Sequence, residues 1–222
     1  MIAPDLLILC RRLRHEFSDP RLLAEALTHR SASGRNNERL EFLGDGVLNF
    51  VIAEQLYSRH PRASEGELSR LRASLVKQET LAAIARELEL GEHLRLGQGE
   101  LKSGGFRRDS ILADALEAIF GAIYLDAGFS AAQTVIVRLF EPLLREQPRA
   151  EQLKDPKTRL QEWLQAQQRP LPLYQVLEVS GEAHRQCFTV ECRVDNVRTV
   201  ASAPSRRRAE QEAAKLALER LQ

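Results

Sequence analysis

The sequence predicts an all-α domain followed by a small α+β domain with the element order α-β-β-β-α. Apolar residues recur with a helical period in most of the first part of the chain, and no convincing strand pattern precedes about residue 170. Three short runs of β-like composition then lie between two helical runs, which is typical of a small α+β domain. We therefore expect one domain at residues 1–147 and a second at residues 156–222.

The stretch between the two predicted domains is polar and contains two prolines. It runs from Glu146 to Pro156 with little periodicity, so we expect a linker at residues 148–155. The net charge of the chain is +1, although residues 149–222 carry 13 Lys and Arg against 10 Asp and Glu. Any contact with nucleic acid must therefore depend on local basic patches rather than on overall charge.

The N-terminal residues do not have the order of a secretion signal. An apolar run precedes a basic one, and no apolar run approaches the roughly 20 residues that a membrane span needs. The three cysteines do not make a disulfide framework, and free thiols are typical of a reducing cytosol. We expect a cytoplasmic protein that has no contact with a membrane.

Two helical stretches of the first domain have clear start signals. Residues 19–31 open with an Asp in the capping position and a Pro at the first helical position. Residues 63–91 open with a capping box formed by Ser64 and Glu67, and Gly91 ends the helical pattern. Residues 99–110 are interpreted as a glycine-rich basic loop.

The second domain contains the β-like runs. Asp195 and Asn196 separate the last two of them, as a tight hairpin turn would. The elements expected in this domain are a helix at 157–167, strands at 173–179, 187–194 and 197–203, and a helix at 205–221.

Residues 37–46 concentrate three acidic side chains, Glu38, Glu41 and Asp45. On a helical wheel they fall within roughly 60° of one another, with apolar residues on the opposite side. The stripe that we expect to be buried comprises Leu40, Leu43, Val47, Phe50 and Val51.

Other residues of this stretch suggest contacts beyond simple burial of the stripe. Phe42 and Leu48 are expected on the acidic side, which suggests a second contact there, such as a partner subunit. Gly44 and Gly46 would each cost about 1 kcal/mol relative to Ala inside a helix. We therefore expect another backbone to approach closely at these glycines.

The apolar helix expected at residues 111–128 repeats the acidic pattern. Asp114 and Glu117 share one face, and Gly121 lies on that face. If the two acidic faces converge, four carboxylates meet, and their repulsion favours a divalent cation. Oxygen ligands without His or Cys favour Mg²⁺, for which Mn²⁺ is expected to substitute. Such an ion can activate a water molecule and stabilise the charged transition state of phosphodiester hydrolysis.

Other interpretations of the acidic residues remain open at this point. Acids opposite an apolar stripe are often only a solvated face, and a purely helical scaffold would need no metal. A di-iron site would need Glu-x-x-His pairs, and none of the five histidines has that spacing. Glu65 lies in the first turn of a predicted helix, where the helix dipole favours an acid in any case.

Taken together, these motifs resemble bacterial ribonuclease III over nearly the whole chain. The run NERLEFLGDG resembles the signature of that family, which usually ends in Gly-Asp-Ser or Gly-Asp-Ala, so Gly46 is a departure. FRRDSILADALEAIFGAIYLDAG resembles the second acidic helix of the family, and PRASEGELSRLRASLV resembles the segment between the two. The C-terminal part resembles a double-stranded-RNA-binding domain.

The resemblance implies a role for each acidic residue. It makes Glu41, Asp45, Asp114 and Glu117 the metal ligands, with Glu117 the residue on which cleavage most depends. Asp45 and Glu117 are thus expected to be catalytic. The family also places two further catalytic acids in the RNA-binding valley, and these correspond to Glu38 and Glu65.

The RNA-binding residues come partly from the sequence and partly from the resemblance. Ser205 is a predicted helix cap followed by Arg206 and Arg207, and a basic helix start is a phosphate site, although a solvated turn has the same pattern. The resemblance adds Gln161, Gln165 and His184 as contacts with the minor groove. Proline in the preceding ASAPS run departs from the glycine-rich approach of the family.

The resemblance implies a Mg²⁺-dependent endonuclease that works as a homodimer on double-stranded RNA. Each subunit would cut one strand, leaving 5′-phosphates, 3′-hydroxyls and two-nucleotide 3′ overhangs. Processing of ribosomal RNA precursors and messenger RNAs is the expected role. The alternative of another class is a double-stranded-RNA binder with a degenerate nuclease domain, which would bind without cutting.

Overall fold

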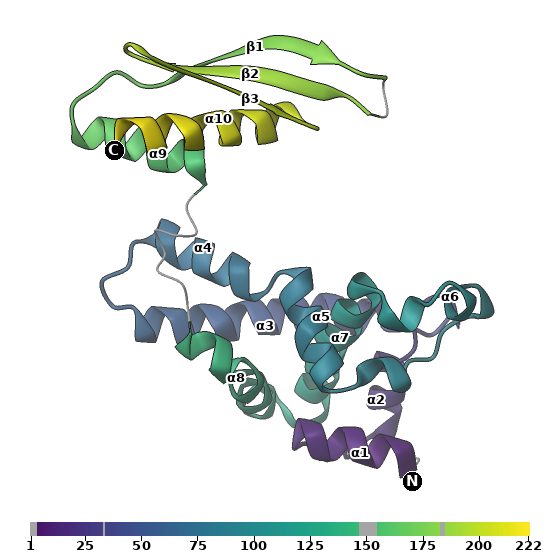
Figure 1. The fold of residues 1–222 in the computed structure, drawn as a ribbon. Coiled ribbons are helices and arrows are strands. Elements are labelled where there is room, and N and C mark those ends of the chain that lie inside the picture. Colours follow the sequence, from purple (N-terminus) through teal and green to yellow (C-terminus); the bar gives the residue numbers. More distant parts are fainter. Residues whose placement is uncertain (1–3, 33, 147–154, 183–184) are drawn as a thin grey trace. The chain divides into compact units, whose positions relative to one another are not determined.

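The computed structural model describes residues 4–32, 34–146, 155–182 and 185–222. The chain divides into two compact units, Met1–Pro148 and Arg149–Gln222. In the described residues the first unit is helical, and the second has the order α-β-β-β-α (Figure 1). The predicted fold class is therefore confirmed. The predicted linker at 148–155 lies outside the described residues except for Asp155. His184 also lies outside them.

The described part of the first unit is built from helices. They are α1 (Pro4–Leu13), α2 (Pro20–Ala26), α3 (Glu38–Arg59), α4 (Glu65–Leu75), α5 (Gln78–Glu87), α6 (Gln98–Lys102), α7 (Asp109–Ala127) and α8 (Phe129–Arg145), with short 3₁₀ turns η1 (Leu90–Glu92) and η2 (Gly105–Arg107). None of the described helices is both long and apolar enough to cross a membrane.

Helix α7 lies at the centre of the first unit and packs against α2, α3, α5 and α8. Leu116, Ile119 and Phe120 have no exposed surface, and the buried residues of α7 surround the helix on nearly all sides. A helix that is apolar on most of its surface needs neighbours on most sides. The two acidic residues in the middle of α7, Asp114 and Glu117, are half-buried exceptions to this pattern.

The predicted helix starts are confirmed, but one predicted helix is divided. Asp19 caps α2, and Ser64 forms a capping box with Glu67 at the start of α4. The pattern at 63–91 is two helices, α4 and α5, because the backbone of Lys77 is extended between them. No Gly or Pro marks this break in the sequence. The loop predicted at 99–110 likewise contains α6 and η2.

The predicted buried stripe of α3 is wrong at Phe50, Leu43 is only half-buried, and a neighbouring prediction is also wrong. Phe50, assigned to the stripe, is 60% exposed and stacks edge-to-face on Phe129 of α8. Leu48, expected beside the acids, is fully buried. Phe42 is exposed as expected, at 84%. The long α3 contacts α4, α7 and α8, so its buried surface is wider than one stripe.

The second unit is a three-stranded antiparallel sheet with two helices packed on one face (Figure 1). Its elements are α9 (Pro156–Ala166), β1 (Leu173–Ser180), β2 (Cys187–Val194), β3 (Val197–Ala203) and α10 (Arg206–Leu221). The predicted hairpin between β2 and β3 is confirmed, with Asp195 in the left-handed conformation and Val194 paired to Val197.

The core of the second unit lies between the helices and the sheet. Leu160 and Leu164 of α9 pack with Cys192 of β2 and with alanines of α10. The small alanine side chains allow α10 to lie close to the strands. The opposite faces of α9 and α10 are exposed to solvent. Of the residues predicted to bind RNA, Gln161, Gln165, Arg206 and Arg207 are exposed on these helices, and Ser205 is the exposed cap of α10.

Candidate active site

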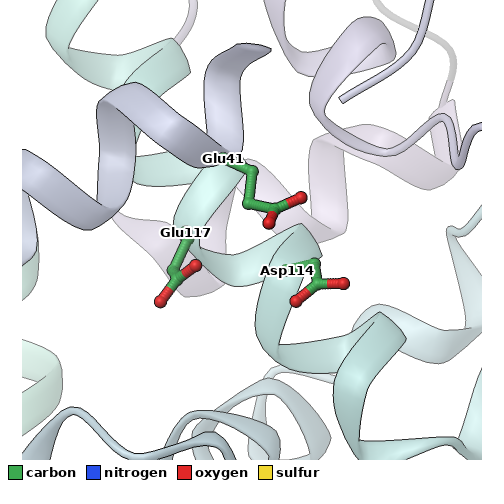
Figure 2. Close-up of side chains that lie close together, drawn as sticks. All are labelled: Glu41, Asp114 and Glu117. Carbon is green, nitrogen blue, oxygen red and sulfur yellow. The ribbon is translucent and has the colours of Figure 1, made fainter. Parts of the chain in front are cut away.

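Three carboxylates meet where α7 crosses α3. One oxygen each from Glu41, Asp114 and Glu117 lies within 4.8 Å of the others, and all three residues are half-buried. Figure 2 shows Glu41 extending from α3 beside the turn of α7 that carries Asp114 and Glu117. We call these residues the carboxylate cluster. The predicted convergence of the two acidic helices is therefore present in the structure.

Two glycines allow this close crossing. A Cβ atom on Gly44 would lie 1.8 Å from the backbone oxygen of Glu117, and one on Gly121 would lie 2.3 Å from the backbone oxygen of Leu40. Each glycine therefore faces the backbone of the other helix. The backbone approach predicted at Gly44 is present, whereas no other described segment of this chain lies within 4 Å of a Cβ on Gly46, so the same prediction is wrong there.

Burial and mutual repulsion make the cluster unfavourable to ionise. Burial, together with the charges of Asp45, Glu41 and Asp114, raises the pKa of Glu117 to about 8. Burial is also the main cause of the raised pKa values of Glu41 and Asp114. His29 and then Arg30 partly offset the increase at Asp114. Without a cation, the cluster therefore tends to hold a proton on Glu117.

The structure leaves the other predicted acids outside this three-residue group. Asp45 is close enough to raise the pKa of Glu117, but its Oδ1 accepts a 2.7 Å hydrogen bond from Asn49 Nδ2. Glu38 is exposed, with Oε1 3.4 Å from Nη1 of Arg30. Glu65 is exposed at the first turn of α4 and accepts a 2.7 Å hydrogen bond from the hydroxyl of Ser69.

A polar pocket of about 470 Å³ extends from Glu41 and Asp114. Beyond those acids and Glu38 it is lined by His29, Arg30, Ser31, Asn37, Glu100, Arg108, Ser110 and Ile111. Arg108 belongs to the glycine-rich basic loop expected at residues 99–110. His29 and Ser31 were not predicted as site residues, because nothing in the local sequence indicates that their loop lies beside α7.

In the second unit the predicted RNA-binding side chains are on exposed helix surfaces. Gln161 and Gln165 are exposed on α9, four residues and so about one turn apart. Ser205 caps α10 and accepts a hydrogen bond from the N–H of Arg208 at 3.3 Å. The side chains of Arg206 and Arg207 lie in the exposed first turn of α10.

A buried carboxylate organises the basic start of α10. Glu210 is only 8% exposed and accepts hydrogen bonds from Arg206 Nε at 2.9 Å and from Lys157 Nζ at 2.6 Å. Lys157 also lies over the ring of Tyr174, 4.3 Å from its centroid. One acid thus joins α9 to α10, and these bonds lower the pKa of Glu210 even though burial opposes this.

Comparison with protein families agrees with this division of the chain. Residues 19–143 match the family model described as "Ribonuclease-III-like", and residues 156–221 match the "Double-stranded RNA binding motif". The chain belongs to the ribonuclease III family. The family match of the first unit contains the entire carboxylate cluster, and that of the second contains the basic start of α10.

Individual ribonuclease III relatives match nearly the full length of the chain. Ribonuclease 3 of Alkalilimnicola ehrlichii is 60% identical over 213 residues, which are 95% of this chain and 93% of the relative. Ribonuclease 3 of Vibrio cholerae is 54% identical over 223 residues, with 99% of both chains covered.

Solved structures of the Campylobacter jejuni ribonuclease III nuclease domain resemble the first part of the chain. One has a TM-score of 0.63 at 45% identity and covers 66% of this chain and 100% of that domain. A second, described as having a region involved in dimer formation, has a TM-score of 0.60 at 48% identity and covers 61% and 95%. The protein is thus an endoribonuclease with a domain that binds double-stranded RNA.

Proposed function

We propose that this ribonuclease III cleaves double-stranded RNA with the help of Mg²⁺ held by the carboxylate cluster. The observation that carries the proposal is the convergence of Glu41, Asp114 and Glu117, whose oxygens lie within 4.8 Å of one another. A cation among them offsets the repulsion that raises their pKa values. The donor set contains only carboxylate oxygens, which suits Mg²⁺, and Mn²⁺ should substitute.

The acids near the cluster have different proposed roles. Glu41, Asp45, Asp114 and Glu117 would hold the ion, and Asp45 would exchange its hydrogen bond with Asn49 for the cation. Bound Mg²⁺ supplies positive charge that stabilises phosphodiester cleavage. Glu117 is the residue on which cleavage most depends. Glu38 and Glu65 are proposed to line the RNA-binding valley, and their exposure is compatible with that role.

The second unit is proposed to hold the duplex by its shape. Gln161 and Gln165 would contact the minor groove, as would His184, which lies outside the described residues. Arg206 and Arg207 would contact phosphates at the start of α10, where the helix also offers free N–H groups. Such contacts follow the A-form geometry and phosphates of RNA rather than its sequence.

We further propose that the enzyme works as a homodimer. Three aromatic side chains are largely exposed along α3, Phe42 at 84%, Phe50 at 60% and Tyr57 at 75%. Exposed apolar surface of this kind favours a protein partner. A region involved in dimer formation is described for the related Campylobacter jejuni nuclease domain. A second copy would place two sites on one duplex, one for each strand.

The proposed products have 5′-phosphates, 3′-hydroxyls and two-nucleotide 3′ overhangs. The proposed substrates are precursors of ribosomal RNA and structured messenger RNAs in the cytoplasm. These details rest on membership of the ribonuclease III family, since neither the cluster nor the basic helix start discriminates one duplex from another.

The proposal is tested with one labelled RNA duplex and the full-length chain. We expect cleavage with Mg²⁺, no cleavage in EDTA, and no cleavage by Glu117→Gln with RNA binding retained. Gel analysis of the products and their ends gives the overhang and the terminal groups. Glu92→Gln, in η1 of the same unit, is the matched control and should cleave as the wild type does.

Two results would contradict the proposal. Cleavage that persists in EDTA would exclude the metal-dependent mechanism. Duplex binding by the wild type without cleavage at any Mg²⁺ or Mn²⁺ concentration would support the non-catalytic binder instead.

A further inference from the structure

His29 lies in the loop after α2 and lines the polar pocket beside Glu41 and Asp114. The loop is anchored by backbone hydrogen bonds to the segment before α6. His29 N–H donates to the carbonyl of Arg95 at 3.0 Å, and Arg95 N–H donates to the carbonyl of Leu27 at 2.8 Å. The half-buried imidazole is therefore attached to a fixed backbone at the edge of the cluster.

The ring of His29 is held by Ser31. The N–H of Ser31 donates to Nδ1 at 3.2 Å, so Nδ1 is a hydrogen-bond acceptor. Ser31 Oγ lies 2.8 Å from Nδ1 and accepts the N–H of Gly97 at 2.9 Å, so the hydroxyl is fixed beside the ring. An imidazole that accepts at Nδ1 carries its proton on Nε2. His29 therefore has an N–H donor at the far end of its ring.

Gly97 makes this arrangement possible. A Cβ on Gly97 would lie 2.3 Å from the backbone oxygen of Ser31, so a larger residue would displace the serine that holds the ring. The carbonyl of Gly97 also accepts the N–H of Leu101 within α6. The start of α6 is thus packed against the loop that carries His29.

The donor on His29 differs from the cations around it. Arg30 Nη1 lies 3.4 Å from Glu38, and Arg108 Nη1 lies 3.0 Å from Glu100, so both guanidinium groups have carboxylate partners. Among the described residues, no hydrogen bond involves Nε2 of His29. A held donor beside a group of metal-binding acids is suited to a ligand with anionic oxygens that also contacts the metal.

We propose that Nε2 of His29 donates a hydrogen bond to a phosphate oxygen of the RNA strand bound at the carboxylate cluster, and that Ser31 positions the ring. This rests on the proposed function, because the phosphate comes to the pocket only with bound RNA. His29 is thus a substrate-binding residue of the nuclease site, and Ser31 acts through it.

The test compares two amide replacements in the full-length protein. The amide nitrogen of Gln reaches the position of Nε2, whereas that of Asn reaches only the position of Nδ1. We expect His29→Asn to lower kcat/KM for a labelled duplex by about 10- to 100-fold, the usual value of a hydrogen bond to a charged group. His29→Gln should stay within about 5-fold of wild type, and Ser31→Ala should lie between them.

Two further measurements separate this role from others. Mn²⁺ binding to the RNA-free protein, followed by calorimetry, should be the same in wild type and His29→Asn. The thermal unfolding midpoints should also agree, which excludes a folding defect. A loss of Mn²⁺ affinity equal to the loss of activity would overturn the proposal, because His29 would then act on the metal ligands.

Three other results would also overturn it. They are an unchanged kcat/KM in His29→Asn, an equal loss in His29→Gln and His29→Asn, and a lowered unfolding midpoint that accounts for the loss. Wild-type protein assayed in parallel keeps the two proposals apart. If the wild type does not cleave with Mg²⁺, the proposed function itself is wrong, and if it cleaves, the result concerns His29 alone.

Discussion

The two proposed nucleic-acid sites of this molecule are built in opposite ways. The carboxylate cluster is half-buried and acidic, and it forms only where α3 and α7 cross. The basic start of α10 is exposed and lies within four consecutive residues, from the cap Ser205 to Arg208. The cluster therefore depends on the packing of distant segments, whereas the basic site depends mostly on the local geometry of one helix end.

The two sites also balance their charges differently. The cluster buries like charges together, and no described residue forms an ion pair with them, so burial and repulsion raise the pKa of Glu117 to about 8 and a cation is favoured. At the start of α10, Glu210 pairs with Arg206 and Lys157, so the basic groups are held without an external ligand. The cluster therefore favours a cation that offsets its repulsion, whereas Arg206 at the start of α10 is already paired within the protein.

The largest effect is expected from Gly44→Ala. The added Cβ would lie 1.8 Å from the backbone oxygen of Glu117, so α3 must move away from α7 and the cluster must open. Overpacking of this severity should lower the free energy of unfolding by about 3 kcal/mol and abolish cleavage. Denaturant unfolding and duplex cleavage measure both. Normal cleavage by this variant would show that the close crossing is not required.

A smaller effect is expected at the basic site. Arg206→Ala combined with Arg207→Ala should weaken binding to every duplex sequence and reduce the slope of log Kd against log salt by about 2. Arg207 is exposed, and Glu210 keeps its bond to Lys157 when Arg206 is replaced, so the loss of unfolding free energy should be small. Fluorescence anisotropy at several salt concentrations gives the slope.

The matched control removes two charges from the other end of α10. Lys215→Ala combined with Arg220→Ala has the same change in net charge but leaves the first turn intact. An equal loss of slope in the control would mean that overall charge, and not the helix start, binds the phosphates. An effect confined to one RNA sequence would contradict recognition by shape.

The raised pKa of Glu117 predicts how stability depends on pH in EDTA. The folded state holds this proton up to about pH 8, whereas an ordinary Glu releases it near 4.5. Between these values the folded state binds more protons, so its stability should fall as pH rises. Thermal unfolding between about pH 5 and pH 8 should show this, with a smaller slope in Glu117→Gln.

Metal and a surface acid provide the controls for this pH dependence. Mg²⁺ requires the ionised carboxylates, so it should stabilise the protein most at the alkaline end of the range. Glu65→Gln changes an exposed acid of α4 and should keep the slope of the wild type. A slope that Glu117→Gln leaves unchanged would assign the proton to another group.

The smallest effect is expected from Gly46→Ala, one turn from the cluster. No other described segment lies within 4 Å of the added Cβ, so the change should raise the free energy of unfolding by at most about 1 kcal/mol through helix propensity. Cleavage should be normal. A loss of cleavage without a loss of stability would indicate that a second subunit packs closely against this position.

Many local features could be predicted because their causes lie within a few residues. The caps at Asp19 and Ser64 are set by side chains that bond to nearby backbone, and the hairpin turn is set by Asp195, which takes the left-handed conformation. The acidic faces of α3 and α7 follow from helical periodicity in the same way. The break at Lys77 was missed because no local residue type causes it.

The sequence by itself determined the two-part fold class, the acidic residues available to a metal and the basic helix start. Only the tertiary structure decided that Glu41 meets Asp114 and Glu117, that Leu48 is buried while Phe50 is exposed, and that His29 borders the cluster. The reason is physical. Helix caps and helical periodicity are set by residues within one or two turns. Side-chain burial and the convergence of the carboxylates depend on which distant segments pack together, and Gly44 and Gly121 allow α3 and α7 to approach closely.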